Sequence, residues 1–480
     1  MLRARSVVLF SCFLSSVTAQ ISPGNVVVLR VGDGTAALTN AATAAFLDEY
    51  TPGGTYVQTV SLPTAQNGAH RPVTLSGTAT SEGALTQTAR AGHLLVAGYG
   101  IAPGGASVAS SSSSSVNRVI ARIGLDETID SSTALADAYS GNNVRGAASY
   151  SGLEFWTAGT ASAANNPSVR YVASLGATTS LQLDAAITNI RRVDVWNTEV
   201  YCVTASGSAF GVCQVGSGLP TNSPQTTTLL PGFPTATGPS PYDFFFANAT
   251  TLYVADDRTT GLGGIQKWVQ IAGVWTLQYT LAPASNVGCR GLSGIVAGGV
   301  TTLFATTTAN TLVKVVDSGA AATALVLASA PTNTAYRGVR FVRTPASLQF
   351  IGQPCNTTAG PPYVGAAGEP VVGNAGFLLA TDNTPPAALV LFAVMAGTVA
   401  PVGVPLPGAQ PCVLVHVLPD VLVASVADAF GSAIYPLPIP NDGALGGVQL
   451  GLQSLVLDAN LAAHPLPFGS SDAMQIVIGN

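Results

Sequence analysis

Charged residues are scarce in this sequence: they make up 9% of its 480 positions, and lysine occurs only as Lys267 and Lys314. The basic residues number 18 and the acidic residues 23. A protein that binds nucleic acid needs a basic surface to neutralise phosphate groups. The composition therefore excludes nucleic acid as a partner.

Long hydrophobic runs are also missing after the first residues. A transmembrane helix requires about 18 consecutive apolar residues, and no later segment reaches this length, so we expect no membrane span. The chain begins with two arginines, an apolar run over 7–14 and small residues, which is typical of a cleaved secretory signal. We predict a signal peptide at 1–19 and a secreted protein, either extracellular or periplasmic. A lipoprotein anchor at Cys12 is the alternative, and Phe10 fits that motif poorly.

Six cysteines are present, and five remain after the predicted cleavage. Export permits disulfide bonds. Cys202 and Cys213 lie in two apolar segments joined by a short turn, so they form either a cross-strand disulfide or two free thiols. Cys355 and Cys412 are a second candidate pair, which leaves Cys289 as a small buried side chain. None of the cysteines has the spacing of zinc ligands.

Histidine is rare, and its four copies are scattered along the chain without the spacing of metal ligands. They are His70, His93, His416 and His464. This distribution argues against a histidine-ligated metal and against a Ser-His-Asp triad. The sequence therefore offers no catalytic motif.

Glycine is abundant, with 52 residues, and threonine, valine, alanine and serine fill the spaces between. These residues favour strands and tight turns, so we predict an all-β protein. Short strand patterns recur, each opening on a charged or aromatic residue, at separations of 63, 46, 51, 48 and 47 residues. The openings are Glu82, Arg145, Arg191, Tyr242, Arg290 and Arg337. Such spacings are typical of the blades of a β-propeller. We expect a serine-rich flexible loop at 109–115, which explains why the first separation, 63 residues, is longer than the others.

The sixth unit has only its opening strand, and three strands that would complete it lie at the other end of the chain, at 26–31, 46–50 and 56–62. Pairing of the two ends closes the ring and removes exposed sheet edges. We therefore predict a six-bladed β-propeller over 20–345, closed by its N-terminal strands. A solenoid or an array of β-sandwiches is the alternative, but it would not leave complementary partial units at its ends.

Beyond residue 345 the composition changes, because no lysine or arginine follows and seven acidic residues remain. Alternating segments separated by proline, glycine and Asn-Asp turns predict strands. We expect a β-sandwich-like C-terminal domain over 346–480, of jelly-roll or immunoglobulin type. Its acidic character suits an interaction tail, a Ca²⁺-holding surface or simply a solubility device.

Several segments of the propeller region carry a resemblance to known proteins. They are NVVVLRVGDGT at 25–35, FLDEYTP at 46–52, GTATSEG at 77–83 and LYVADD at 252–257. The region resembles a family of secreted bacterial six-bladed β-propeller proteins of uncharacterised activity, so the resemblance implies fold and export only. PIPND at 438–442 and LVLD at 455–458 are similar to C-terminal β domains on secreted proteins of planctomycete-like bacteria.

Equivalent positions in a propeller converge on its axis, so the six openings should surround one mouth of the channel. Four of them are arginines, and the full set is Arg145, Arg191, Arg290, Arg337, Glu82 and Tyr242. Converging guanidinium groups would bind a carboxylate, phosphate or sulfate bidentately, which predicts a ligand site for an anionic small molecule or a polysaccharide. The structural alternative is that these arginines bond carbonyl groups of neighbouring blades or pair with nearby acids.

Our leading hypothesis is a secreted, non-enzymatic binding or scaffold protein whose propeller mouth recognises an anionic or carbohydrate ligand, with no catalytic residue and no cofactor. The alternative is a lactonase-like or other hydrolase that holds Ca²⁺ on the axial carboxylates Glu82, Asp194 and Asp243. Nearby arginines would oppose a bound cation, which weakens the alternative.

Overall fold

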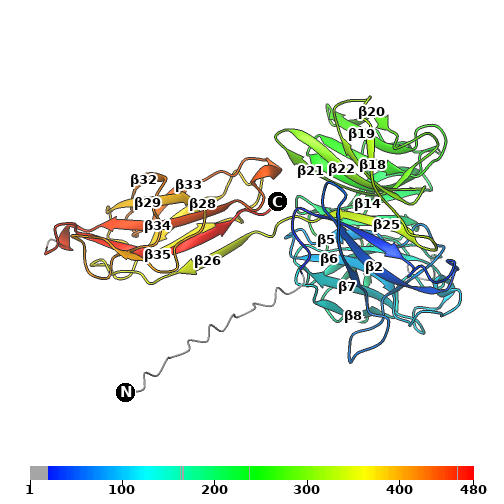
Figure 1. Cartoon of the computed structure of the whole chain (residues 1–480), viewed down its shortest axis with the longest axis horizontal. Coiled ribbons are helices and arrows are strands. Elements are labelled where there is room, and N and C mark those ends of the chain that lie inside the picture. The colour runs from blue at the N-terminus through cyan, green and yellow to red at the C-terminus, as the bar shows by residue number, and fades with distance from the viewer. Residues whose placement is uncertain (1–19, 163, 165–166, 237, 462) are drawn as a thin grey trace, which may run out of the picture.

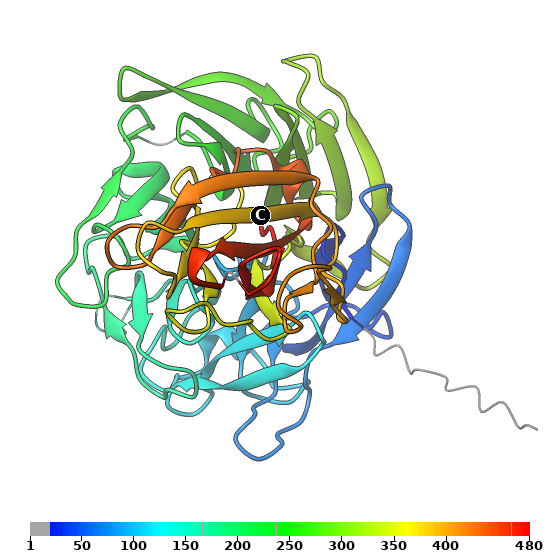
Figure 2. The same cartoon turned by 90° about the vertical axis from the view of Figure 1, so that its left-hand side faces the viewer.

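The computed structural model describes residues 20–480 apart from 163, 165–166, 237 and 462. The predicted signal peptide and Cys12 lie outside the described residues. Figure 1 shows a ring of strands at one end of the molecule and a smaller, elongated β body at the other. Viewed end-on, the smaller body lies in front of the centre of the ring (Figure 2). Among the described residues, no helix is long and apolar enough to cross a membrane.

The ring is a β-propeller of six blades, each an antiparallel sheet of four strands. The innermost strands are β5 (Leu85–Gln87), β9 (Val144–Ala148), β13 (Ile190–Trp196), β17 (Pro241–Asn248), β21 (Cys289–Ala297) and β25 (Ala335–Phe341). The second strands are β6 (His93–Tyr99), β10 (Phe155–Gly159), β14 (Glu199–Ser206), β18 (Thr251–Asp256), β22 (Val300–Thr307) and β1 (Val26–Val31). The third strands are β7 (Arg118–Gly124), β11 (Arg170–Val172), β15 (Ala209–Val215), β19 (Gly264–Ile271), β23 (Thr311–Val316) and β2 (Ala42–Tyr50). The outer strands are β8 (Ile129–Leu135), β12 (Leu181–Gln182), β16 (Thr227–Leu229), β20 (Val274–Leu281), β24 (Ala324–Ser329) and β3 (Tyr56–Ser61), and β4 (Thr74–Ser76) joins β2 to β6.

The last blade is built from both ends of the propeller sequence. β1 pairs with β25 on one side and with β2 on the other, and β3 adds the outer edge. Val28 lies opposite Val339 in the β1–β25 pairing, and both side chains are fully buried. The sequence of β1, VVVLRV, lacks polar alternation because separate hydrophobic clusters cover its two faces. The prediction of a six-bladed propeller closed by its N-terminal strands is confirmed.

The inner strands approach each other closely around the axis. The backbone N–H of Gly338 in β25 donates to the carbonyl of Gly83, just before β5, at 2.9 Å. A Cβ atom on Gly338 would lie 2.3 Å from the backbone nitrogen of Leu85. Only glycine therefore fits this contact between the last and the first inner strand.

The serine-rich segment at 109–115, which we expected to be a flexible loop, is held by hydrogen bonds. It begins within a short 3-10 turn, η1 (Val108–Ser110). The fully buried Arg118 donates to the carbonyls of Ser111 and Tyr139 at 2.8 and 2.9 Å. A buried guanidinium needs acceptors for its N–H groups, and the serine-rich segment supplies part of them.

The smaller body is a β-sandwich, here called the C-terminal sandwich. One sheet contains β26 (Ser347–Ile351), β35 (Phe468–Val477), β34 (Gln449–Leu457), β29 (Leu389–Ala396) and β32 (Val421–Val426), in that order. The other contains β27 (Tyr363–Ala367), β28 (Leu378–Asp382) and β33 (Ala433–Pro436), and the connections hold β30 (Val404–Pro405), β31 (Leu414–Val415), η3 (Gly443–Leu445) and η4 (Ala459–Leu461). Leu379 from the second sheet packs with Val390 and Leu452 from the first. The predicted sandwich is confirmed, with a core between its two sheets.

The cysteines divide between the two bodies. Cys355 and Cys412 form a disulfide in the C-terminal sandwich, with their Cα atoms 5.3 Å apart. Cys202 of β14 lies directly opposite Cys213 of β15, yet both are free, buried thiols. Cys289 is also free and buried. The second candidate disulfide of the sequence is therefore present, whereas the first pair are neighbours without a bond.

Candidate functional site

Most of the predicted ring residues lie together at one end of the propeller channel, which we call the arginine mouth. Each opens its inner strand or just precedes it. A cavity there is lined by Glu82, Arg191, Tyr242, Arg290 and Arg337. The Tyr242 ring lies between two guanidinium groups, with the Cζ atoms of Arg191 and Arg290 at 4.1 and 5.8 Å from its centroid. The structure thus brings five of the six predicted ring residues together, and Arg145 is not among the residues that line this cavity.

The polar groups of the arginine mouth are largely bonded to the protein itself. Arg191 donates to the Pro241 carbonyl of the next blade at 2.9 Å, and Arg337 donates to the Gly77 carbonyl at 2.9 Å. Arg145 donates to the side chain of Asn189. The cavity measures about 20 Å³, which is room for one water molecule. These are the contacts of the structural alternative, in which the arginines join neighbouring blades.

The three axial carboxylates proposed for Ca²⁺ are not gathered at one point. Asp194 and Asp243 both pair with the fully buried Arg192, and Glu82 accepts hydrogen bonds from Tyr99 and from the Ser76 backbone at 2.6 and 2.8 Å. Across the described ranges, no group of three or more histidine, cysteine, aspartate or glutamate side chains is placed to hold a metal ion. Each carboxylate is therefore bonded to donors of the protein itself, charged ones at Asp194 and Asp243 and uncharged ones at Glu82.

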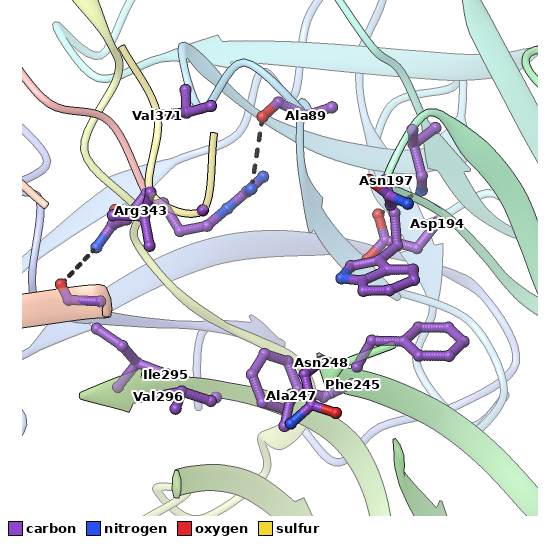
Figure 3. Close-up of a pocket in the computed structure, with 18 of the residues that line it drawn as sticks. Ala89, Asp194, Asn197, Phe245, Ala247, Asn248, Ile295, Val296, Arg343 and Val371 are labelled. Carbon is purple, nitrogen blue, oxygen red and sulfur yellow. Dashed lines mark hydrogen bonds between the residues drawn. The ribbon is translucent and has the colours of Figure 1, made fainter. Parts of the chain in front are cut away.

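A second cavity, of about 550 Å³, lies at the opposite end of the propeller, where the inner strands finish and the C-terminal sandwich covers them. We call it the covered mouth. Its volume is typical of pockets that hold small molecules. Figure 3 shows Arg343 on one side of this cavity, Asp194 and Asn197 on the facing side, and Phe245 and Ala247 along another wall.

Contacts between the two bodies close the rim of the covered mouth. Arg90 of the propeller pairs with Glu369 of the sandwich, with Nη2 and Oε1 2.6 Å apart. The backbone N–H of Gly298, after β21, donates to Asp442 Oδ1 at 2.9 Å. The C-terminal sandwich therefore forms part of the cavity wall.

Asp194, near the end of β13, is the buried carboxylate of the covered mouth. Its Oδ2 accepts from Arg192 and Arg340 at 2.9 and 3.0 Å, and among the described residues its Oδ1 accepts from the backbone N–H of Val195 alone. Burial alone would raise the pKa of Asp194, but the positive charges of Arg340, Arg192 and Arg343 outweigh it, so the pKa lies below its ordinary value. The side chain is thus ionised and can accept one more hydrogen bond at Oδ1.

Arg343 is the unbalanced charge of the covered mouth. It donates to the carbonyls of Thr88 and Ala89 at 2.7 and 3.4 Å, and within the described part of the chain no carboxylate pairs with it. Its Nε has no hydrogen-bond partner among the described residues. Burial, with a further contribution from the charge of Arg340, lowers the pKa of Arg343 to about 9. A guanidinium in this state would be stabilised by an anion in the cavity.

Sequence signals for this second site are weak. The sequence predicts Asp194 as a metal ligand and does not single out Arg340 and Arg343, although these two arginines continue the spacing of three that begins at Arg337. The repeat is recognised by the starts of the inner strands, whereas the covered mouth lies at their ends. No sequence pattern indicated that the C-terminal sandwich would cover it.

Comparisons with known proteins give similar structures but no family. No family model and no curated protein matches the chain. A putative 6-phosphogluconolactonase from Bacteroides uniformis is 12% identical, with a TM-score of 0.37, over 64% of this chain and 83% of its own. The periplasmic gluconolactonase PpgL of Pseudomonas aeruginosa is 11% identical, with a TM-score of 0.34, over 84% of this chain and 99% of its own. The dihydro-heme d1 dehydrogenase NirN is 9% identical, with a TM-score of 0.34, over 95% and 75%.

Our leading hypothesis of a non-enzymatic binding or scaffold protein is contradicted. The similar solved structures bear the names of lactonases and of a dehydrogenase, and the hydrolase alternative agrees with them better. The geometry supplies a physical reason for the correction. The arginine mouth has room for about one water molecule, whereas the larger cavity lies at the other end of the channel.

Proposed function

We propose that the chain is a hydrolase of small lactones or carboxylic esters whose active site is the covered mouth. The observation that carries this proposal is Arg343, a partly buried cation that lines the cavity without a carboxylate partner in the described part of the chain. We also propose export by the signal peptide at 1–19, which places the enzyme in the periplasm or outside the cell.

The charge of the cavity suits this reaction. The charged side chains of its lining are Arg90, Arg340 and Arg343 against Asp194 and Glu369, which leaves one positive side-chain charge. A lactone or ester is neutral, and its tetrahedral transition state carries one negative charge on the former carbonyl oxygen. A site with one unmatched positive charge therefore stabilises the transition state more than the substrate.

Each step uses side chains of the covered mouth. A water molecule bonded to Asp194 Oδ1 attacks the carbonyl carbon and transfers its proton to that carboxylate. The C=O electron pair moves onto the carbonyl oxygen, beside Arg343. The oxyanion then reforms the carbonyl, the bond from carbon to the ring or alkoxy oxygen breaks, and that oxygen takes the proton back from Asp194. The products are a carboxylic acid and a hydroxyl group, joined in one molecule when the substrate is a lactone.

The test is hydrolysis of a panel of lactones and aryl esters, followed by proton release, with wild type, Arg343→Gln and Arg71→Gln. Arg71 is a matched control, because its guanidinium bonds the exposed Gln66 far from the cavity. We expect Arg343→Gln to lower kcat by about 100-fold or more, as loss of one oxyanion donor does, while Arg71→Gln keeps wild-type rates. Wild-type protein that hydrolyses nothing in the panel, or a folded Arg343→Gln variant with full activity, would overturn the proposal.

A further inference from the structure

The wall of the covered mouth beside Asp194 is aromatic and aliphatic. Trp196 of β13 stacks on Phe246 of β17, with ring centroids 4.5 Å apart and an angle of 18° between the rings. Phe245 and Ile295 line the same cavity from β17 and β21, and Val371 lines it from the C-terminal sandwich. Aromatic and aliphatic side chains from both bodies thus face one space.

Three polar side chains in the same lining are bonded to the protein itself. Asn248 Oδ1 accepts from the Thr250 backbone at 2.9 Å, and Asn480 Oδ1 accepts from the Thr344 backbone at 2.6 Å. The hydroxyl of Thr198 donates to the Asn197 carbonyl at 2.7 Å. A polyhydroxylated ligand needs a partner for each hydroxyl that it buries, whereas an apolar ligand body needs only the aromatic and aliphatic wall.

Resting on the proposed function, we infer that the substrates are lactones or esters with an apolar alkyl or aryl body. The carbonyl group lies between Asp194 and Arg343, and the apolar body lies against Trp196, Phe245 and Ile295. Binding removes the apolar body from water, so each additional methylene that the cavity accommodates raises kcat/KM about fourfold.

The experiment measures kcat/KM for γ-lactones of increasing alkyl length, from γ-butyrolactone to γ-dodecalactone, beside glucono-δ-lactone. We expect kcat/KM to rise about fourfold per methylene until the cavity is full, with glucono-δ-lactone below the longer lactones. Ile295→Ser should reduce the advantage of the long lactones about tenfold, and Val326→Ser, whose side chain lies on the outer strand β24 at 55% exposure, should not change it. Hydrolysis that is independent of alkyl length, or fastest with the sugar lactone, would overturn the inference.

A second measurement separates this inference from the proposed function. Matched γ-lactams resist hydrolysis, and their binding can be followed by quenching of Trp196 fluorescence, with Trp196→Phe as the reference. Affinity that rises with alkyl length while no lactone is hydrolysed would support the apolar ligand and refute the hydrolase. Hydrolysis without any dependence on alkyl length would support the hydrolase and refute the apolar substrate class.

Discussion

Asp317 joins two neighbouring blades through one buried carboxylate. It lies after β23, and its Oδ2 is 2.8 Å from Nζ of Lys267 in β19, in the next blade. The hydroxyl of Tyr279 donates to Oδ1 at 2.8 Å, and the hydroxyl of Tyr253 also donates to Asp317. The Asp317 side chain is 2% exposed, so solvent screens these contacts little. Burial alone would raise the pKa of Asp317, but the hydrogen bonds from Lys267, Tyr253 and Tyr279 outweigh it and lower the pKa to about 2.

The size of the effect follows from that pKa. The carboxyl has an ordinary pKa of 3.8, and a difference from 3.8 to about 2 corresponds to about 2 kcal/mol of folding free energy when the group is ionised in both states. Because the folded-state pKa is lowered, this stability is present above pH 4 and is lost as pH falls through about 2. We expect Asp317→Asn to lower the free energy of unfolding of the propeller by about 2 kcal/mol at pH 7 and by about 1 kcal/mol at pH 3.

Urea unfolding followed by tryptophan fluorescence measures this difference, because all four tryptophans lie in the propeller. A double-mutant cycle with Lys267→Met isolates the ion pair from the tyrosine contacts. An Asp317→Asn variant whose free energy of unfolding at pH 7 equals that of wild type would refute the reasoning. A variant whose loss in free energy of unfolding is as large at pH 3 as at pH 7 would also refute it.

Two further predictions concern packing and the disulfide. Gly338→Ala places a Cβ atom 2.3 Å from the Leu85 nitrogen, so we expect a loss of about 3 kcal/mol in urea unfolding, against less than about 0.5 kcal/mol for Gly92→Ala, where nothing lies within 4 Å. Equal losses in both variants would contradict the close contact at the axis. Replacing both Cys355 and Cys412 with alanine opens a loop with a sequence separation of 57, which should destabilise the C-terminal sandwich by about 4 kcal/mol. Calorimetry should show a lower unfolding temperature for the sandwich and an unchanged unfolding temperature for the propeller. A change in the unfolding temperature of the propeller alone would contradict the prediction that the disulfide stabilises the sandwich.

The propeller could be predicted from the sequence because each blade repeats one pattern. In addition, the strands left unassigned at the two ends of the propeller sequence together complete one blade. The lone strand at Arg337 and the three unassigned strands near the N-terminus complement each other, and the structure pairs them as β25 with β1 to β3. In the C-terminal sandwich no repeat fixes the register. For example, β27 reads YVGAA and β32 reads VLVASV, and neither segment alternates apolar with polar residues regularly.

The candidate site was less accessible to sequence reasoning. Alignment showed which residues share a position in the repeat, and Arg191, Tyr242 and Arg290 do meet at one mouth. It could not show whether the space between them would be filled, because that depends on bonds such as the one from Arg337 to the Gly77 carbonyl. The covered mouth depends on how two bodies dock, and contacts such as Arg90 with Glu369 join residues that are almost three hundred positions apart.

Closure of the ring by its two ends also fixes an order of events during synthesis. Val28 can meet Val339 only after the entire propeller has been translated, since 311 positions separate the two partners. At about 5 to 20 residues per second, the first strand waits about 15 to 60 s for the last. During that time β1, an apolar segment with both faces uncovered, is available to other chains. The last blade therefore stays incomplete for as long as translation of the rest of the propeller takes.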